Sequence, residues 1–289
     1  MENIRGLFVT DLDGTLLTDN KTISDIDMRS LSCLQKNGFL TVIATGRSDY
    51  SFFSLLDNLG FSGESPSLPV DYVIFSTGAG IMMYPTKRLL KNFSLQQEDV
   101  QLITKYLNSF SLDFMVHQPV PDTRYFLYSS HGHENDDFHR RLKIYSTFAR
   151  PFSSEAEKGM GGATEVLCIV PKEKGHDIAE MVAQHFTQFS VIKATSPLDG
   201  ESVWIEIFPP MVSKSLAVQW LLDNIGFSVE NVCAVGNDYN DEDLLHWAGH
   251  SFVVANSPST MLIDFSTVAC NNENGVSEAA RRWLDTFKE

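Results

Sequence analysis

Cysteine is scarce and scattered in this chain of 289 residues. The four cysteines include no pair separated by only two residues, the spacing typical of a zinc site. Cys33, Cys168 and Cys233 lie within apolar segments, where a cysteine usually serves as a small core residue. The pattern argues against a disulfide framework and favours a reducing, cytoplasmic location.

Long apolar runs and basic charge are also lacking. No run approaches the roughly 20 apolar residues that a membrane span needs, and the first residues lead into a strand-like segment without the features of an export signal. With 22 Lys and Arg against 37 Asp and Glu, the formal net charge is -15. Such acidity argues against nucleic acid or an anionic membrane as a partner, and no obligate protein partner is evident. An anionic substrate would need a metal ion and a few cations placed around it.

Buried strands alternate with amphipathic helices at both ends of the chain. Apolar runs at 7–10, 40–44 and 72–75 predict strands that are buried on both faces. Between the first two, Ser24 and Asp27 resemble a helix cap, Leu31 and Leu34 form an apolar face, and Gly38 ends the helix. The pattern returns with a helix from Ser213, strands at 232–235 and 252–255, and helices near 241–247 and 276–287. This alternation predicts an α/β fold with a parallel sheet covered by helices.

Residues 85–208 have a different texture. Alternating patterns at 123–128, 165–170 and 202–207 predict an antiparallel sheet with one buried face, and helical patterns occur near 98–108 and 176–189. We therefore expect an α+β domain inserted into a host domain formed by residues 1–84 and 209–289. The histidine-rich stretch 131–139 within the insertion is interpreted as a solvated loop and helix start rather than a metal site.

Two polar segments directly follow strands of the predicted parallel sheet. Asp11 and Asp13, in Asp11-Leu12-Asp13-Gly14-Thr15, come at the end of the first strand, where two carboxylates can share a hard cation. An ordinary Asp-Gly turn is the alternative. Thr45, in Ala44-Thr45-Gly46-Arg47, could hold a phosphate oxygen with Arg47 as a bidentate clamp, or could merely cap a helix.

Two further segments belong to the C-terminal part of the sheet. Lys214 begins a predicted helix, where it opposes the helix dipole and hints at a nearby anion, although a surface lysine is the plain alternative. The segment Gly236-Asn237-Asp238-Tyr239-Asn240-Asp241 follows the 232–235 strand. It offers oxygen ligands at the same sheet edge as Asp11, or it is an acidic turn that caps a helix.

In this order, DLDGT, ATGR, a helix-opening lysine and GNDYND resemble the haloacid dehalogenase-like (HAD) superfamily, and more narrowly its Cof-type hydrolases with a type IIB cap. Ser76-Thr77-Gly78-Ala79 and Asn272-Glu273-Asn274-Gly275-Val276 add lesser matches. The resemblance covers essentially the whole chain. It implies a Rossmann-like parallel-sheet core (1–84 and 209–289) and an α+β cap (85–208) that sets specificity. The implied activity is Mg2+-dependent hydrolysis of a small phosphorylated metabolite, such as a sugar phosphate.

The resemblance also implies a role for individual residues. Asp11 would be the nucleophile that forms an aspartyl-phosphate, and Asp13 the general acid/base, with its backbone carbonyl on the metal. Lys214 would balance the charge of Asp11 and the phosphate, and Thr45 would bind a phosphoryl oxygen. The implied substrate contacts are Thr45, Gly46, Arg47, Gly78, Lys214 and Asn240, and the implied Mg2+ ligands are Asp11, Asp13, Asn237 and Asp241.

One departure from the family concerns the metal. Asn237 stands where the family usually has an aspartate, so the site would carry one negative charge fewer. A shift of one residue that brings Asp238 to the metal is the alternative; keeping Asn237 preserves the family's spacing to Asn240 and Asp241. Asp241 is expected to hold either Lys214 or a metal-bound water. Two other functions stay open: a sugar-phosphate mutase of the same superfamily, and a non-catalytic phosphometabolite-binding protein.

Overall fold

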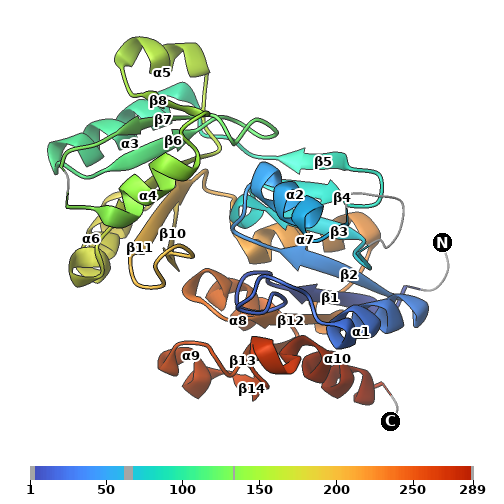
Figure 1. The fold of residues 1–289 in the computed structure, drawn as a ribbon. Helices are drawn as coiled ribbons and strands as arrows, with labels where there is room; N and C mark the ends of the chain where they lie inside the picture. The colour runs from blue at the N-terminus through green and yellow to red at the C-terminus, as the bar shows by residue number, and fades with distance from the viewer. Residues whose placement is uncertain (1–3, 62–67, 133, 288–289) are drawn as a thin grey trace. The chain divides into compact units, whose positions relative to one another are not determined.

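Two compact units make up the chain in a computed structural model that describes residues 4–61, 68–132 and 134–287 (Figure 1). The first unit comprises residues 1–47, 52–91 and 213–289. The second comprises residues 48–51 and 92–212.

An eight-stranded sheet in the order β14-β13-β12-β1-β2-β3-β4-β5 forms the centre of the first unit. Its strands are β1 (Gly6–Thr10), β2 (Phe39–Ala44), β3 (Tyr72–Phe75), β4 (Gly80–Met83), β5 (Arg88–Asn92), β12 (Val232–Gly236), β13 (His250–Val254) and β14 (Ser266–Val268). From β14 to β3 neighbouring strands pair in parallel, whereas β4 is antiparallel to β3. The predicted Rossmann-like parallel sheet is confirmed.

Helices cover both faces of this sheet, as Figure 1 shows. They are α1 (Asp25–Lys36), α2 (Asp49–Asn58), α7 (Lys214–Ile225), α8 (Glu242–Trp247), α9 (Ser259–Asp264) and α10 (Gly275–Asp285). Because side chains alternate along a strand, β1 serves two layers. Leu7 and Val9 belong to the apolar cluster that includes α7 and α8, whereas Phe8 packs on Trp283 of α10 with ring centroids 6.0 Å apart. Burial on both faces fixes β1, and with it the position of the residue that follows, Asp11.

The predicted cap and apolar face of the first helix, α1, are both present. The Ser24 side chain accepts the N–H of Asp27 and caps α1, and Leu31 and Leu34 are fully buried. Cys33, expected in the core, is instead exposed. Its place in the helical period lies off the stripe formed by those leucines, so the apolar segment does not bury every member.

A six-stranded sheet in the order β10-β11-β9-β6-β7-β8 forms the centre of the second unit. Its strands are β6 (Phe114–His117), β7 (Phe126–Ser129), β8 (Ala149–Pro151), β9 (Glu165–Val170), β10 (Ser190–Thr195) and β11 (Val203–Phe208). Its helices are α3 (Gln97–Ser109), α4 (Asp136–Ile144), α5 (Ser154–Met160) and α6 (Lys172–His185). The pairing is antiparallel except between β7 and β8.

Both faces of this second sheet carry buried apolar side chains. The prediction of a sheet with only one buried face is therefore wrong. Side chains of α3 and α6 join the cluster on one face. On the other face, Phe138 of α4 clusters with Met115 and Leu167. The prediction failed because the sequence was interpreted as a solvated loop and helix start at 131–139, so α4 was not expected to bury a second face of the sheet.

The junctions between the units lie a few residues from the predicted ones. The chain leaves the first unit after Lys91 rather than after Tyr84, because β5 extends the eight-stranded sheet beyond β4. It returns at Ser213, at the N-cap of α7, rather than at Pro209. Residues 48–51 belong to the second unit, where Thr123 Oγ1 donates to Asp49 Oδ1 over 2.6 Å.

The histidine-rich stretch leads into α4. Asn135 caps this helix by accepting the Phe138 N–H, and the Nε2 of His139 lies 2.9 Å from the Gly132 carbonyl oxygen. His133 lies outside the described residues. Within the described part of the chain, no three His, Cys, Asp or Glu side chains form a group suited to a metal. Nor does any helix there have the length and apolar character that a membrane crossing needs.

Candidate active site

Asp11 and Lys214 form a buried ion pair at the carboxyl end of β1. The backbone N–H of Asp11 donates to the Val235 carbonyl of the neighbouring β12 over 2.8 Å, which holds Asp11 at the sheet edge. Lys214, the first residue of α7, donates from Nζ to Asp11 Oδ1 over 2.7 Å. Lys214 is fully buried and Asp11 nearly so. Residues 203 positions apart in sequence therefore meet where the motifs predicted them to meet.

Burial and charge pull the ionisation of this pair in opposite directions. Burial raises the pKa of Asp11 above its ordinary value, and Lys214 pulls it back down. Burial acts to lower the pKa of Lys214, but Asp11 and Asp241 outweigh it and raise that pKa. The lysine therefore remains a permanent cation beside a carboxylate that is largely shielded from water.

Asp241 holds Lys214 from a second side. Its Oδ1 accepts from Lys214 Nζ over 2.6 Å, and its Oδ2 accepts the backbone N–H groups of Asn237 at 2.9 Å and Asp238 at 3.1 Å. Gly236 makes room for this carboxylate, because an added Cβ would lie 2.6 Å from the Asp241 Cβ. Of the two roles expected for Asp241, these contacts favour the one that holds Lys214. Direct metal binding by Asp241 stays a prediction without a supporting contact.

Oxygen atoms of Asp11 and Asp13 converge on the side-chain amide of Asn237 in front of β1. One of the two terminal atoms of the Asn237 side-chain amide, either its nitrogen or its oxygen, lies 3.2 Å from Asp11 Oδ2 and 2.9 Å from the Asp13 carbonyl oxygen. With nitrogen at this position the amide donates to both oxygens. With oxygen there, three oxygens face one another and only a cation satisfies them all.

The spacing of these atoms suits Mg2+. Adjacent oxygen ligands of an octahedral Mg2+ lie about 3.0 Å apart, given metal–oxygen bonds of roughly 2.0–2.1 Å. The residues that would hold the ion are therefore Asp11, Asp13 through its carbonyl, and Asn237. Of the two alternatives at the fourth motif, the amide of Asn237 has the supporting geometry, whereas the Asp238 side chain accepts the Asp241 N–H in a capping box.

Gly14 and Thr15 shape this oxygen group. Gly14 has a φ of +75°, and an added Cβ would lie 2.6 Å from Asn237 Nδ2, so only glycine permits the close approach. The hydroxyl of Thr15 lies 3.0 Å from the same amide of Asn237. Thr15 belongs to the motif that begins with Asp11, but the sequence predicted no contact for it.

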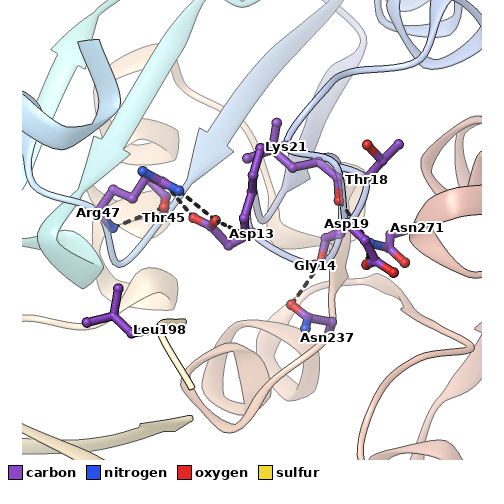
Figure 2. Close-up of polar contacts among 12 residues, drawn as sticks. Asp13, Gly14, Thr18, Asp19, Lys21, Thr45, Arg47, Leu198, Asn237 and Asn271 are labelled. Atoms are coloured by element: carbon purple, nitrogen blue, oxygen red, sulfur yellow. Dashed lines mark hydrogen bonds and ion pairs between the residues drawn. The ribbon is translucent and has the colours of Figure 1, made fainter. Parts of the chain in front are cut away.

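The carboxylate of Asp13 is held by two cations (Figure 2). Arg47 binds it in a bidentate manner, from Nε to Oδ2 over 2.6 Å and from Nη2 to Oδ1 over 2.8 Å. Lys21 Nζ donates to Oδ1 over 3.2 Å. Burial acts to raise the pKa of Asp13, but the two cations outweigh it and hold that pKa below its ordinary value. Arg47, predicted to clamp the substrate, clamps Asp13 in this structure.

Lys21 is a site residue that sequence reasoning missed. It lies in the loop between β1 and α1, where hydrogen bonds between Thr18 and Thr22 fold the chain back on itself. A loop return of this kind has no period, so the sequence carried no signal that Lys21 would reach Asp13. With Arg47 and Lys214 it supplies the local positive charge that an acidic chain needs to receive an anion.

The loop after β2 places Thr45 and Gly46 beside this group. Thr45 is buried, and its hydroxyl oxygen accepts the Arg47 N–H over 3.1 Å. It does not cap a helix, because α2 begins only at Asp49 and Ser48 accepts the Ser51 N–H of its first turn over 3.2 Å. Asn240 lies close to Gly46, because an added Cβ on Gly46 would sit 3.4 Å from the Asn240 Nδ2. Phosphate binding by these three residues stays a prediction.

Gly78 has a structural reason to be glycine. Its φ is +115°, and an added Cβ would lie 2.3 Å from the Ser213 carbonyl oxygen. Close packing here supports the N-terminus of α7, the helix that begins with Lys214. Substrate contact by Gly78 stays a prediction.

The sequence pattern of the haloacid dehalogenase-like hydrolases matches residues 8–279. The chain belongs to this family. The family match confirms both the predicted resemblance and the predicted enzyme class, a HAD-type hydrolase.

Known proteins of similar sequence span nearly the whole of this HAD-like hydrolase. A protein of Streptococcus pyogenes serotype M6, provisionally named a phosphatase, is 26% identical over 96% of this chain and 98% of its own length. The 5-amino-6-(5-phospho-D-ribitylamino)uracil phosphatase YwtE of Bacillus subtilis is 25% identical over 92% of this chain and 94% of its own. In fold, a solved HAD subclass IIB sugar phosphatase matches 96% of this chain and 98% of its own with a TM-score of 0.73 and 15% identity. A similarity at that identity concerns the fold alone.

Proposed function

We propose that this HAD-like hydrolase is a phosphatase that uses Mg2+ to hydrolyse phosphate monoesters of small metabolites. The buried contact between Lys214 and Asp11 supports the proposal most directly. A carboxylate held 2.7 Å from a permanent cation, beside a backbone carbonyl and an amide at the spacing of Mg2+ ligands, is suited to attack an anionic phosphoryl group.

The proposed reaction proceeds in two steps. A carboxylate oxygen of Asp11 attacks phosphorus, the ester P–O bond breaks, and the leaving oxygen takes a proton from Asp13. Asp13 then takes a proton from water, whose oxygen attacks the aspartyl-phosphate, regenerating Asp11 and releasing inorganic phosphate. Asp13 gives up one proton in the first step and regains one in the second, so the enzyme ends the cycle in its starting protonation state.

The surrounding residues would stabilise charge during both steps. Mg2+, when held by Asp11, Asp13 and Asn237, would neutralise part of the charge on the phosphoryl oxygens. Lys214 would neutralise another part, and the hydroxyl of Thr45 would bind one phosphoryl oxygen. Arg47 would move from Asp13 to a substrate oxygen, which frees Asp13 to carry the proton that a general acid requires.

The names of the similar proteins support a substrate class. The uracil derivative carries its phosphate on a ribityl chain, and the subclass IIB protein is named a sugar phosphatase, so both act on phosphorylated carbon chains rich in hydroxyl groups. We propose a sugar phosphate or polyol phosphate as the substrate here. We also propose that the second unit acts as the cap that selects it, and that the enzyme acts in the cytoplasm.

The test is a phosphatase assay over a panel of sugar, polyol and nucleotide monophosphates, with and without Mg2+. Asp11→Asn is expected to abolish turnover, whereas Asp57→Asn, the same change at an exposed position on α2, should leave it intact. Mass spectrometry of rapidly quenched enzyme should find one phosphoryl group on the peptide that contains Asp11. Turnover that survives Asp11→Asn would refute the mechanism.

A non-catalytic binding function has one observation in its favour. The Asn237 amide, with nitrogen inward, satisfies the oxygens of Asp11 and Asp13 without any metal. Under this alternative, calorimetry would detect tight binding of a phosphorylated metabolite without Mg2+-dependent release of phosphate. A mutase would instead interconvert sugar phosphates and require a sugar bisphosphate.

A further inference from the structure

The loop between β1 and α1, residues 12–24, carries Asp13 and Lys21 but has little secondary structure to support it. Within it, Leu17 makes isolated β-bridges to Asp13 and to Ile23, and the rest consists of turns, a bend and irregular segments. Such a loop needs contacts from elsewhere if Asp13 is to keep one position.

Three asparagines from distant segments supply those contacts. Asn271 uses both hydrogens of its side-chain nitrogen, donating to the Leu17 carbonyl over 3.0 Å and to Asp19 Oδ1 over 3.1 Å. Asn272 donates to Asp19 Oδ2 over 2.8 Å and accepts the Asp19 N–H over 3.0 Å. Figure 2 shows Asn271 directed toward Asp19 beside the loop.

Asn256 extends this set to the residue next to Asp13. Its side-chain nitrogen donates to the Gly14 carbonyl over 2.8 Å, and its oxygen accepts the backbone N–H of Asn271 over 3.0 Å. Asn256 follows β13 and Asn271 follows β14, so the loops after two neighbouring strands hold the loop after β1. Asn271 is buried, whereas Asn256 and Asn272 are exposed.

We propose that Asn256, Asn271 and Asn272 form an asparagine clamp that positions Asp13 for the reaction. The inference rests on the proposed function, in which both the carbonyl and the carboxylate of Asp13 have defined partners. Asn256 binds the carbonyl of Gly14, the residue after Asp13, and Asn271 binds the turn that returns Lys21 to the Asp13 carboxylate. These asparagines are positioning residues, because they act through the loop and not on the substrate.

Amide side chains suit this task for a physical reason. Amides can donate and accept at once, as Asn256 does between Gly14 and Asn271, or donate twice, as Asn271 does to Leu17 and Asp19. They also add no charge near Asp13, whose partners are already the two cations Arg47 and Lys21. A carboxylate in place of Asn271 would keep the shape but would face the Leu17 carbonyl and the Asp19 carboxylate without a proton to donate.

The decisive variant is therefore Asn271→Asp, which is nearly isosteric. A displacement of about 1 Å at a reacting group is worth about a hundredfold in rate. We expect kcat to fall about tenfold to a hundredfold, with KM changed by less than about threefold. Asn224→Asp is the matched control, because Asn224 also donates to a backbone carbonyl, that of Trp220 over 2.7 Å, but at the exposed end of α7.

Hydrogen–deuterium exchange supplies a readout that does not depend on turnover. Asn271→Asp should speed exchange in the peptide covering residues 12–24 and leave peptides of the second unit unchanged. If wild-type protein lacks phosphatase activity, the proposed function fails, yet faster exchange would still establish the clamp. Asn256→Asp, which loses the donor to Gly14 but keeps the acceptor for Asn271, tests the same inference if Asn271→Asp does not fold. Wild-type kcat, or wild-type exchange over residues 12–24 in the folded variants, would overturn it.

Discussion

Replacing Asn237 with aspartate is expected to destabilise the metal-free protein. The new carboxylate would take the place of an amide atom that lies 3.2 Å from Asp11 Oδ2 and 2.9 Å from the Asp13 carbonyl oxygen. Two unit charges at that separation from Asp11 repel by about 5 kcal/mol at an effective dielectric constant near 20. Rotation of the side chains and uptake of a proton relieve part of this, so we expect a loss of about 2–3 kcal/mol in the free energy of unfolding.

The same replacement is expected to strengthen Mg2+ binding. An ion between the two carboxylates removes the repulsion, and the relieved energy appears as binding energy. A gain of about 2–3 kcal/mol corresponds to a dissociation constant lower by roughly 30- to 150-fold. The variant should therefore be less stable than wild type without Mg2+ and should gain more stability from it.

Thermal unfolding across a Mg2+ titration measures both effects in one assay. The Tm of Asn237→Asp should start below that of wild type and rise at lower Mg2+ concentrations. Asp238→Asn is the control, because an amide there can still accept the Asp241 N–H that closes the capping box. An unchanged Mg2+ midpoint in Asn237→Asp, together with weakened binding in Asp238→Asn, would place the metal at Asp238 and refute the assignment.

Two further predictions concern buried charge. Burial, reinforced by the charge of Glu206, raises the pKa of Glu165 well above its ordinary value, so the folded state keeps this group neutral and loses that stability as pH rises from the ordinary pKa of about 4.5 toward the raised one. Glu165→Gln should therefore match wild type in Tm near pH 4 and exceed it increasingly toward pH 8; a constant difference would contradict this. Lys214→Met should leave Asp11 and Asp241 buried without a cation, costing about 3–5 kcal/mol at pH 8 and less at pH 5, because burial raises the pKa of Asp11 to about 7 and Asp11 can then be protonated; equal loss of Tm at both pH values would count against the ion pair.

Much of the fold could be predicted because its signals are local. The runs at 7–10 and 72–75 are apolar without alternation, and they form strands buried on both faces of a parallel sheet. Asp11 then has to lie at the carboxyl edge of the sheet, where the segment after β12 also lies. Lys214, the first residue of α7, lies at the same edge. The family resemblance, which gave Lys214 the role of balancing the charge of Asp11, was also needed to predict that the two meet.

Other features were not predictable because their partners have no fixed spacing. The second face of the six-stranded sheet is buried by α4, a nine-residue helix that follows a stretch interpreted from the sequence as a solvated loop. Arg47 was expected on the substrate, but the loops after β1 and β2 bring it to Asp13 instead. Lys21 reaches the same carboxylate through a turn that no periodicity announces.

The sequence by itself determined the family, the strands that carry the site, and the identity of Asp11, Asp13, Thr45 and Lys214 as its candidate chemical groups. Only the tertiary structure decided which atoms face one another: Asp241 on Lys214, the Asn237 amide on the Asp11 and Asp13 oxygens, and Asn271 on the loop after β1. Strand burial is encoded in short stretches of neighbouring residues. Hydrogen bonds between loops more than 200 residues apart in sequence depend instead on where the paired strands and the turns place those loops in space.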